Sequence, residues 1–544
     1  MEDFFFSPNF RKMLAAFVEV EKNSPLVLKP GCKVQIRVLK GALWIFNYLL
    51  HPTETFVTIE SSKYSSCLVL ESSHVDDEAE GEGSTLIEVQ SCDGTSEDGI
   101  QSCFMRLEEA MENGGSSFLS FPPSWHNICQ GLQQGGKAAV GALVMGNKNV
   151  GKSSLSRFLI NGILGGVAAA DNSMRSVVYL VDLDSGQPEF TPSGVISLAR
   201  IAKPMLSSET DSCADIIYSL SVGSCSPKDF PKSYLSASMH LLDLASTLVS
   251  IDDDDDRNDD SIGRQFVIVN TPGWTKGLGL EYLKAIQSHP LFTHCILVGG
   301  GEKCQKVFDS LLSSRSLLLT NSDDIMNPSS ASPLLWSADA SPVAAGLTSR
   351  SQNFDIRNHK LMAYLATHER SSLVVSLQNI AVLCLSPLPP HKILHALNGS
   401  LVSLLHVPGL ELNPAAGNIV NFIPETCPFP VSEWMGYGVV AQVLTDDING
   451  VVHLKIINCP SDMASRINCI CLSRLVSLPT DFITRFNDDD IENLNDNQYV
   501  DDGGSMEQMV KKSFIEYRIA ADGQLGARSK RFRGNLMRKV HASS

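Results

Sequence analysis

Alternating hydrophobic and polar residues dominate the beginning of the chain. In the segment CKVQIRVLK, residues 32–40, every second residue from Val34 to Val38 is apolar and the residues between them are polar. This is the period of a strand with one buried face. Gly41 then separates this segment from a second apolar run. The pattern predicts antiparallel sheet between about residues 26 and 70.

Further along the chain, short continuous apolar runs replace the alternation. They are AAVGALVM (138–145), SVVYLVDLD (176–184), RQFVIVNT (264–271) and HCILVGG (294–300). Continuous apolar strands separated by longer mixed segments indicate a parallel sheet that helices cover on both faces. The first run is followed by the glycine-rich stretch GNKNVGKSS and then by LSRFLINGIL, which has the apolar spacing of an amphipathic helix.

A third region begins after about Leu377. Two apolar runs flank Asn449-Gly450, a strong hairpin signal. We therefore predict an α/β protein with a central, mostly parallel P-loop NTPase domain at 131–370, flanked by a β-rich N-terminal domain at 1–130 and a mixed C-terminal domain at 371–544. A stretch SFPPSW, residues 120–125, is expected to be the linker that leaves the first domain.

Charge modifies this picture only locally. The 544 residues carry 43 basic and 60 acidic side chains, a formal net charge of −17, which argues against a protein that coats nucleic acid nonspecifically. Much of the acid is concentrated in stretches that are expected to be solvated loops, at 72–99, from Asp252, and at 487–504. A short basic tail occupies 528–539. A local basic groove is therefore compatible with the overall charge.

The fourteen cysteines show no repeated spacing and no CxxC pair, so neither a disulfide framework nor a zinc module is predicted. Cys469 and Cys471 are expected to be buried core thiols on one face of a strand. The N-terminus does not resemble a secretory signal, and no apolar run reaches 18 residues. We expect an intracellular, soluble protein with no membrane partner.

The stretch GNKNVGKSS matches G-x-x-x-x-G-K-[ST] in full. Successive backbone N–H groups must point inward around phosphate oxygens in such a loop, and a Cβ at the glycine positions would obstruct them. A strand before it and a helix after it supply the expected context. The predicted nucleotide-binding residues are Gly146, Asn147, Lys148, Asn149, Val150, Gly151, Lys152, Ser153 and Ser154.

Two carboxylates follow the next apolar run, in VYLVDLDSGQPEFTPSG. Asp182 and Asp184 lie two residues apart where a strand gives way to a loop, so both are expected at the carboxyl edge of the sheet beside the phosphate loop. A carboxylate there can hold Mg²⁺ or accept a proton from an attacking hydroxyl. The plainer alternative is a pair of solvated turn residues.

A GTPase is the first alternative that the phosphate loop suggests. It should carry Asp-x-x-Gly at the end of a later strand and Asn-Lys-x-Asp to select guanine. In FVIVNTPGW, Asn270 stands where that aspartate would lie, and no Asn-Lys-x-Asp follows. The sequence therefore shows no source of guanine selection.

DLDSGQPEFTPSG and NTPGWTKGLGLEYL together resemble the nucleolar polynucleotide 5'-hydroxyl-kinase family of pre-rRNA processing, which is related to the kinase subunit of the mRNA cleavage factor. The resemblance covers about residues 138–365. Ser185 and Ser193 stand where many members have proline.

This resemblance implies that ATP or another nucleoside triphosphate, with Mg²⁺, phosphorylates the 5'-hydroxyl end of RNA. Lys152 would bind the β- and γ-phosphates, and Ser153 with Asp182 would hold the magnesium ion. Asp182 or Asp184 would deprotonate the 5'-hydroxyl, and Asp184 is favoured because it is nearer to the Gly-Gln turn. The residues implied for the substrate are Gln187, Thr271, Gly273, Trp274 and Arg350.

The family also brings positive charge over the transferred group from an arginine-bearing lid, expected here near 345–365. Arg350 and Arg357 are seven residues apart, on one face of a helix. Arg357 is the first candidate for the catalytic arginine, and an arginine on an exposed helix that serves only solubility is the alternative.

The resemblance further implies a nucleolar protein that works with the endoribonuclease of pre-rRNA spacer cleavage. The basic tail is open to three interpretations, a nuclear address, an RNA arm or a partner-binding segment. Two other functions stay open at this point. One is a non-catalytic nucleotide-binding scaffold for that endoribonuclease, and the other is a GTPase-like assembly factor.

Overall fold

The computed structural model describes residues 15–61, 68–73, 84–92, 97–112, 121–134, 139–167, 175–207, 213–251, 262–299, 309, 333–340, 350–369, 371–385, 389, 392–410, 421–423, 431–445, 451–460, 463–473, 478, 517–519 and 525–527. The chain divides into two compact units. The first comprises Met1–Asp184, Ser197–Ile217 and Met239–Asn353, and the second comprises Ser185–Ile196, Tyr218–Ser238 and Phe354–Ser544. The acidic segment that begins at Asp252, the acidic stretch 487–504 and the basic tail lie outside the described residues.

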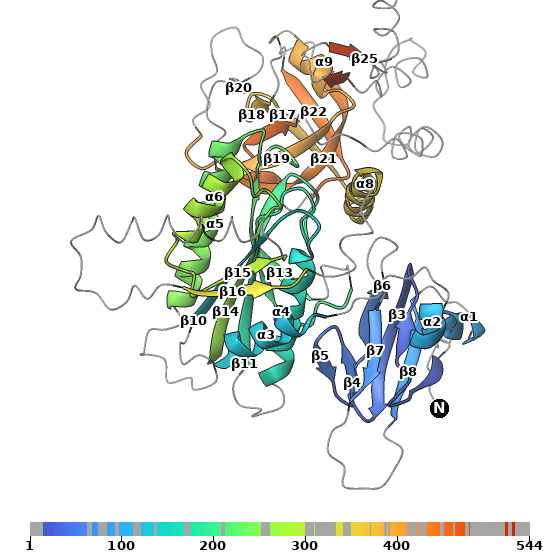
Figure 1. Ribbon diagram of the computed structural model, residues 1–544. Helices are drawn as coiled ribbons and strands as arrows, with labels where there is room; N and C mark the ends of the chain where they lie inside the picture. The colour runs from blue at the N-terminus through green and yellow to red at the C-terminus, as the bar shows by residue number, and fades with distance from the viewer. Residues whose placement is uncertain are drawn as a thin grey trace, which may run out of the picture. The chain divides into compact units, whose positions relative to one another are not determined.

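The N-terminal part of the first unit is built from antiparallel strands (Figure 1). They form one sheet in the order β1-β8-β3-β6 and another in the order β5-β4-β7-β2-β9. The strands are β1 (Ala15–Val20), β2 (Leu26–Leu28), β3 (Cys32–Lys40), β4 (Leu43–Ile45), β5 (Tyr48–Leu50), β6 (Val57–Ser61), β7 (Leu68–Ser72), β8 (Thr85–Ser91) and β9 (Phe104–Arg106). Val34, Ile36 and Val38 are buried, as their alternation predicts. The β-rich N-terminal region is thus confirmed.

The prediction of a loop across 72–99 is wrong for its second half. Residues 85–91 form β8, which lies between β1 and β3, and α1 (Glu97–Ser102) begins within the same stretch. Ile87 and Val89 are fully buried. The acidic and glycine-rich residues on both sides hid a short alternating run whose apolar face supplies the centre of this sheet.

A tight turn of this N-terminal part packs against the central part of the same unit. Phe46 and Asn47 connect β4 to β5 with φ of 48° and 63°, the two-residue hairpin geometry. The Asn47 side-chain amide donates to the Phe158 carbonyl at 3.0 Å, and the Asn161 amide donates to the Phe46 carbonyl at 3.1 Å. Both partners lie on α4 (Lys152–Val167), so the turn is fixed to the helix that follows the phosphate loop.

This contact explains why a helix interior carries glycine, which weakens helices. A Cβ at Gly162 would lie 2.2 Å from Asn47 Nδ2 and 2.6 Å from Cys129 Sγ. Asn47 cannot swing away without losing its hydrogen bond to α4, and Cys129 is buried. Glycine at this position lowers helix propensity but allows the turn at Asn47 to lie close against α4.

We expect Gly162→Ala to destabilise the protein, although alanine favours helix by about 1 kcal/mol. Overpacking costs about 1 to 3 kcal/mol, so the midpoint of urea unfolding should fall. Gly165→Ala is the matched control, because its Cβ would meet nothing closer than Tyr48 Cδ2 at 3.3 Å. An unchanged or higher midpoint for Gly162→Ala would contradict this account.

The central part of the first unit is an α/β structure with the predicted parallel strands. Its sheet has the order β16-β15-β10-β14-β11-β12. All neighbouring pairs from β16 to β11 are parallel, and β12 is antiparallel to β11. The strands are β10 (Ala139–Gly146), β11 (Arg175–Asp182), β12 (Val195–Ile201), β14 (Ile262–Asn270), β15 (His294–Val298) and β16 (Leu334–Ala338). The prediction of a mostly parallel central sheet is confirmed.

Helices cover this sheet, with α4 and α6 on opposite sides of it in Figure 1. The described residues of the first unit include the helices α1, α2 (Leu107–Glu112), α3 (Pro123–Gln134), α4, α6 (Leu278–Gln287) and the greater part of α5 (Pro231–Ile251). The expectation of a linker at 120–125 is wrong from Pro123 onward, since α3 begins there and Trp125 is fully buried. Its indole packs against Phe158 of α4, with ring centroids 5.5 Å apart.

The second unit contains the C-terminal sheet, in which the last residues of β13 (Ala214–Ser221) pair with β21, and β21 continues through β19, β23 and β18 to β20. β22 pairs with both β21 and β17. The remaining bounds are α8 (Arg350–Thr367), β17 (Ser372–Ser376), β18 (Ala381–Cys384), α9 (Ile393–Leu397), β19 (Leu401–His406), β20 (Asn421–Ile423), β21 (Ser432–Thr445), β22 (Val452–Ile457), a 3₁₀ turn at Ala464–Arg466, β23 (Cys469–Leu472), β24 (Tyr517–Ile519) and β25 (Leu525–Ala527).

Two predictions about the C-terminal region are confirmed by this sheet. β21 and β22 are antiparallel, with Thr445 opposite Val452, as the hairpin signal indicates, although Asn449 and Gly450 themselves lie outside the described residues. Cys469 and Cys471 are fully buried in β23, and burial raises the pKa of the Cys469 thiol to about 12. They are core thiols.

In the part of the chain that the structure describes, no helix has the length and apolar character needed to span a membrane.

Candidate functional site

The phosphate loop connects β10 to α4 with the backbone geometry that the glycines were expected to provide. Gly146 has a φ of 155°, and a Cβ there would lie 2.5 Å from the Val298 carbonyl oxygen of β15. Asn149 and Gly151 have φ of 61° and 96°. Left-handed residues separated by ordinary ones turn consecutive N–H groups to one side, which forms an anion-binding concavity. α4 begins immediately afterwards at Lys152, so its N-terminus adds a positive dipole end.

Lys152 is the most informative side chain of this loop. It is 6% exposed, and its Nζ donates to the Asn147 carbonyl oxygen at 2.9 Å. Burial lowers the pKa of Lys152 to about 8, the charge of Asp184 opposes that effect, and the charge of Lys148 adds to it. A buried ammonium with a lowered pKa lacks sufficient negative charge around it. A bound polyphosphate would supply that charge.

The carboxyl ends of three parallel strands meet beside this loop. Val144 of β10 is opposite Asn270 of β14, and Asn270 is opposite Asp182 of β11. The Asn270 amide donates to Asp182 Oδ1 at 3.0 Å and to Ser153 Oγ at 3.3 Å. The register of the sheet thus brings a carboxylate from one strand to the first turn of the phosphate-loop helix.

The two predicted carboxylates differ in their surroundings. Asp182 is 1% exposed, and its Oδ1 also accepts the backbone N–H of Asp184 at 3.1 Å. Asp184 is half-buried in the loop after β11, close enough to Lys152 for its charge to affect the pKa of that lysine. Asp182 is thus linked to Ser153 through Asn270, whereas Asp184 is the more accessible of the pair.

These groups fit a magnesium ion that is held together with a nucleotide. Mg²⁺ in such sites takes one or two protein oxygens, and phosphate and water complete its octahedron. Ser153 Oγ and a carboxylate oxygen of Asp182 are two possible metal ligands. Both accept a hydrogen bond from the Asn270 amide. Asn270 Oδ1 is buried without a hydrogen-bond partner, so the site has one further polar acceptor that a bound ligand could use. Among the described residues no cluster of three His, Cys, Asp or Glu side chains could hold a metal by itself.

The predicted substrate loop, Thr271 to Trp274, lies directly on the phosphate loop. The Thr271 hydroxyl donates to the Val144 carbonyl at 2.8 Å. A Cβ at Gly273 would lie 2.5 Å from Lys148 Cα. Trp274 is half-buried, and its ring stacks on Tyr282 with centroids 6.3 Å apart and an interplanar angle of 24°. The first unit thus brings Lys152, Asp182 and this loop together.

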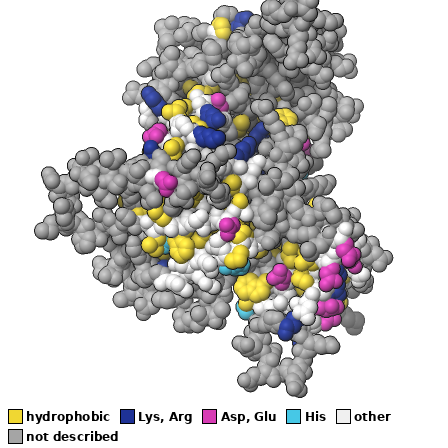
Figure 2. All heavy atoms as spheres, in the orientation of Figure 1, with side chains coloured by type: hydrophobic (Ala, Val, Ile, Leu, Met, Phe, Trp, Pro, Cys, Tyr) yellow, Lys and Arg dark blue, Asp and Glu magenta, His cyan; other side chains and the backbone are white. Residues whose placement is uncertain are grey.

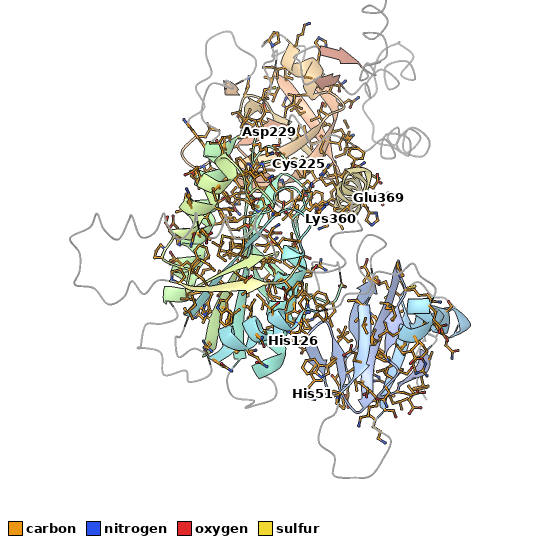
Figure 3. All side chains as sticks on the ribbon, viewed as in Figure 1. His51, His126, Cys225, Asp229, Lys360 and Glu369 are labelled. Atoms are coloured by element: carbon orange, nitrogen blue, oxygen red, sulfur yellow. The ribbon has the colours of Figure 1, made fainter. Side chains whose placement is uncertain are left out.

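The loop that carries Gln187 belongs to the second unit. The Ser193 hydroxyl donates to the Gly186 carbonyl at 3.1 Å, and the Gly194 N–H donates to the Ser185 carbonyl at 2.8 Å. The loop is thereby closed on itself. The Lys360 ammonium of α8, labelled in Figure 3, donates to the carbonyl oxygens of Pro188, at 2.5 Å, and Glu189, at 3.2 Å.

The predicted lid residues belong to α8, and the helix itself is confirmed from Arg350 onward. Arg357 is half-buried. Leu361 and Leu365 are buried in a cluster with Tyr437 of β21, so this part of the helix is anchored in its unit. Residues 345–349 lie outside the described residues, and the catalytic roles of Arg350 and Arg357 stay predictions.

Sequence reasoning missed three residues of this arrangement. Asn270 excludes a GTPase and begins the stretch NTPGWTKGLGLEYL, but it was assigned no role in the site, although its place at the end of a strand beside the phosphate loop is itself a signal of a site residue. Thr275 donates its hydroxyl to the side-chain oxygen of Asn147, which is 128 residues away in the sequence. The Pro188 partner of Lys360 is 172 residues away, so neither residue gives a local signal.

Comparisons with known proteins agree with this geometry. Residues 146–332 match the family model described as mRNA cleavage and polyadenylation factor CLP1 P-loop. The polynucleotide 5'-hydroxyl-kinase grc3 of Aspergillus fumigatus is 35% identical over 173 residues, and GRC3 of Candida glabrata is 29% identical over 174. These alignments cover 30% and 31% of this chain but only 19% and 25% of the relatives. The matched segment therefore spans about a fifth to a quarter of the relatives' length.

A solved structure extends the likeness of the fold beyond the matched segment. A chain of the wild-type Clp1p-Pcf11p complex superposes with a TM-score of 0.53 and 13% sequence identity, covering 86% of this chain and 99% of the other. Residues 146–332 thus match the CLP1 P-loop model, a segment of the chain is similar to the GRC3 kinases, and the chain has the fold of Clp1p.

Proposed function

We propose that this protein transfers the γ-phosphoryl group of ATP, or of another nucleoside triphosphate, to the 5'-hydroxyl of RNA. The observation that carries the proposal is the edge of the sheet at which β10, β11 and β14 end, where Lys152, Ser153 and a carboxylate pair stand around one phosphate loop. The names of the relatives agree with this chemistry. The alternative of two solvated turn residues does not fit Asp182, which is 1% exposed.

The residues of the donor side have separable roles. Bound ATP supplies the phosphoryl group, and Mg²⁺ neutralises part of the negative charge of the phosphates. Lys152 binds the β- and γ-phosphates, since its buried ammonium needs a counter-charge. Ser153 and Asp182 hold the magnesium ion, and Asn270 orients both of them.

On the acceptor side, Asp184 accepts the proton of the 5'-hydroxyl. Its greater exposure and its position after the end of β11 suit contact with an incoming RNA end. Trp274 offers a stacking face to a terminal base, worth about 1 to 3 kcal/mol irrespective of base identity. Thr271 and Gly273 complete the acceptor loop of the first unit. The resemblance assigns Gln187 to the substrate as well, and it assigns to Arg357, with Arg350 as the second candidate, the stabilisation of the charge that spreads over the transferred group.

One face of the N-terminal part does not suit a polyanion, since Figure 2 shows acidic side chains gathered on it. Glu108 and Glu109 of α2 are exposed. RNA is therefore expected to approach the loops at the end of the central sheet.

The biological setting is part of the same proposal. The resemblance to the nucleolar kinases supports a role in pre-rRNA spacer processing, in the nucleolus, beside an endoribonuclease that leaves a 5'-hydroxyl end. The basic tail, residues 528–539, is a candidate for nuclear import or for contact with RNA or that partner. Co-purification of a ribonuclease with the full chain, and its loss when the tail is deleted, would test the partner-binding role.

The decisive experiment measures transfer of labelled γ-phosphate by the full chain to 5'-hydroxyl RNA, to 5'-hydroxyl DNA and with no acceptor. A polynucleotide kinase labels the 5' end. A nucleotide-binding scaffold labels nothing, and a GTPase-like factor hydrolyses GTP without an acceptor. Competition among ATP, GTP and the other triphosphates gives the donor preference.

The lowered pKa of Lys152 predicts a pH dependence of nucleotide binding. In the free protein this pKa is about 8, and bound phosphates raise it because they stabilise the ammonium. Below about pH 7 the lysine is already protonated, so binding takes up no proton there. At pH 8.5 Lys152 is neutral in most molecules of the free protein, so nucleotide binding takes up a proton. Above this pH the affinity for the nucleotide therefore falls by up to about ten-fold per pH unit.

Isothermal titration calorimetry in buffers of different ionisation enthalpy counts these protons. Lys152→Arg is the matched control, because an arginine does not titrate in this range and the titration of the nucleotide's own phosphates is unchanged. Equal proton uptake by wild type and Lys152→Arg at pH 8.5 would contradict the assignment.

A further inference from the structure

The substrate loop after β14 is attached to the phosphate-loop segment at both of its ends. At the first end, the backbone N–H and the hydroxyl of Thr271 both donate to the Val144 carbonyl, at 3.3 and 2.8 Å. At the second end, the Thr275 hydroxyl donates to the side-chain oxygen of Asn147. Thr275 is 6% exposed, so solvent does not compete strongly for this bond.

No space is left between these attachments. A Cβ at Gly273 would lie 2.5 Å from Lys148 Cα and 2.6 Å from the Lys148 nitrogen. The backbones of the two loops are therefore in contact at the position between the two threonines. A movement of the phosphate loop at 147–148 must displace residues 273–275 as well.

The same segment fixes the indole of Trp274. A Cβ at Gly279 would lie 2.4 Å from Trp274 Cγ, so the start of α6 touches the ring, and Tyr282 stacks on it. Thr275 follows Trp274 directly in the chain. The indole thus contacts α6, and the residue next to it in the chain bonds through its hydroxyl to the phosphate loop.

We propose that Thr275 is a positioning residue through which nucleotide binding orders the Trp274 loop. Phosphate groups bound by Lys152 fix the position of its ammonium. They thereby fix Asn147 as well, because the same ammonium donates to the Asn147 carbonyl. Asn147 then holds Thr275, which is joined to Trp274 through the backbone. The result is positive linkage, in which the nucleotide and the polynucleotide end each tighten the binding of the other. This inference rests on the proposed acceptor role of Trp274.

The linkage is measured as the affinity of a fluorescent 5'-hydroxyl RNA oligonucleotide with and without a non-hydrolysable ATP analogue and Mg²⁺. We expect the analogue to tighten binding about five-fold in the wild type, the effect of one buried neutral hydrogen bond. Thr275→Val keeps the shape but loses the hydroxyl, so the ratio should fall to about one. Thr275→Ser retains the hydroxyl and should restore it.

Asn147→Ala tests the same bond from its other partner. Lys152 bonds to the main-chain oxygen of Asn147, so this variant removes the acceptor of Thr275 and leaves that main-chain oxygen in place. The double variant Asn147→Ala, Thr275→Val should lose no more linkage than either single variant. Additive losses, or a ratio that persists in Thr275→Val, would overturn the proposal.

A readout without RNA separates this inference from the proposed function. Trp274 emission, assigned as the difference between wild type and Trp274→Phe, should change when the ATP analogue binds, and this change should vanish in Thr275→Val. If the protein neither binds RNA nor transfers phosphate, the proposed function is refuted. If Trp274 emission does not change when the ATP analogue binds, the positioning role is refuted.

Discussion

Lys152→Ala is expected to lower phosphate transfer to a 5'-hydroxyl end by about a thousand-fold or more, because it removes the charge that opposes the developing negative charge on the transferred group. The fold should not suffer. Burial lowers the pKa of Lys152 to about 8, so at neutral pH the free protein holds a charge that its surroundings disfavour. Removing that charge relieves the free protein of an unfavourable group. Thermal unfolding without nucleotide should therefore show equal or higher stability for the variant.

The control for this experiment is a lysine outside the site. Lys284 on α6 forms an exposed ion pair with Glu281 at 3.1 Å, the kind of pair that contributes about 0 to 1 kcal/mol. Lys284→Ala should transfer phosphate at the rate of the wild type. Residual transfer by Lys152→Ala within ten-fold of the wild type would contradict the role of the phosphate loop.

The parts of the fold that could be predicted from sequence are those fixed by local patterns. The phosphate loop required glycine at Gly146 and Gly151 because both residues have positive φ, and the apolar strand before it fixed its context. The parallel strands were recognisable because burial on both faces leaves continuous apolar runs. In each case the physical cause lies within about ten residues of the signal.

β8 shows why a local pattern can also fail. Its run TLIEVQS alternates, but it is short and lies between acidic, glycine-rich stretches whose composition indicates a loop. What makes it a strand is pairing with β1 and β3 on both edges. Tertiary pairing overrides local composition when a strand is central, and such pairing is invisible in a single sequence.

The candidate site divides in the same way. Lys152 and Ser153 are defined by spacing, and Asp182 by its place at the end of a strand. Asn270 connects Ser153 to Asp182 only because the registers of β10, β14 and β11 align, and register is a property of the whole sheet. The contact between Lys360 and the loop at 188–189 requires two segments that are 172 residues apart. The proposed function rests on local motifs that the sequence displays, whereas the groups that position their side chains could not be found in it.

Asp184→Asn is expected to lower transfer by about 10² to 10⁴-fold, the usual contribution of a general base, with little change in the affinity for the nucleotide. Asp182→Asn should act differently. Asp182 is buried and shares Asn270 with Ser153, so its loss weakens the hold on the metal, and a higher concentration of Mg²⁺ should recover much of the rate. Rates measured over a range of Mg²⁺ concentrations distinguish the two variants. Rescue of Asp184→Asn but not of Asp182→Asn would reverse the roles assigned here.

Asp184→Asn has a second expected effect, which does not depend on catalysis. The negative charge of Asp184 raises the pKa of Lys152 against the effect of burial. Without that charge the pKa of Lys152 falls further below 8, so more of the free protein carries a neutral lysine at neutral pH. Proton uptake on nucleotide binding should therefore begin at a lower pH in Asp184→Asn than in the wild type. Calorimetry at pH 7 would detect this uptake, and an unchanged proton count would mean that Asp184 lies too far from Lys152 to share the reaction with it.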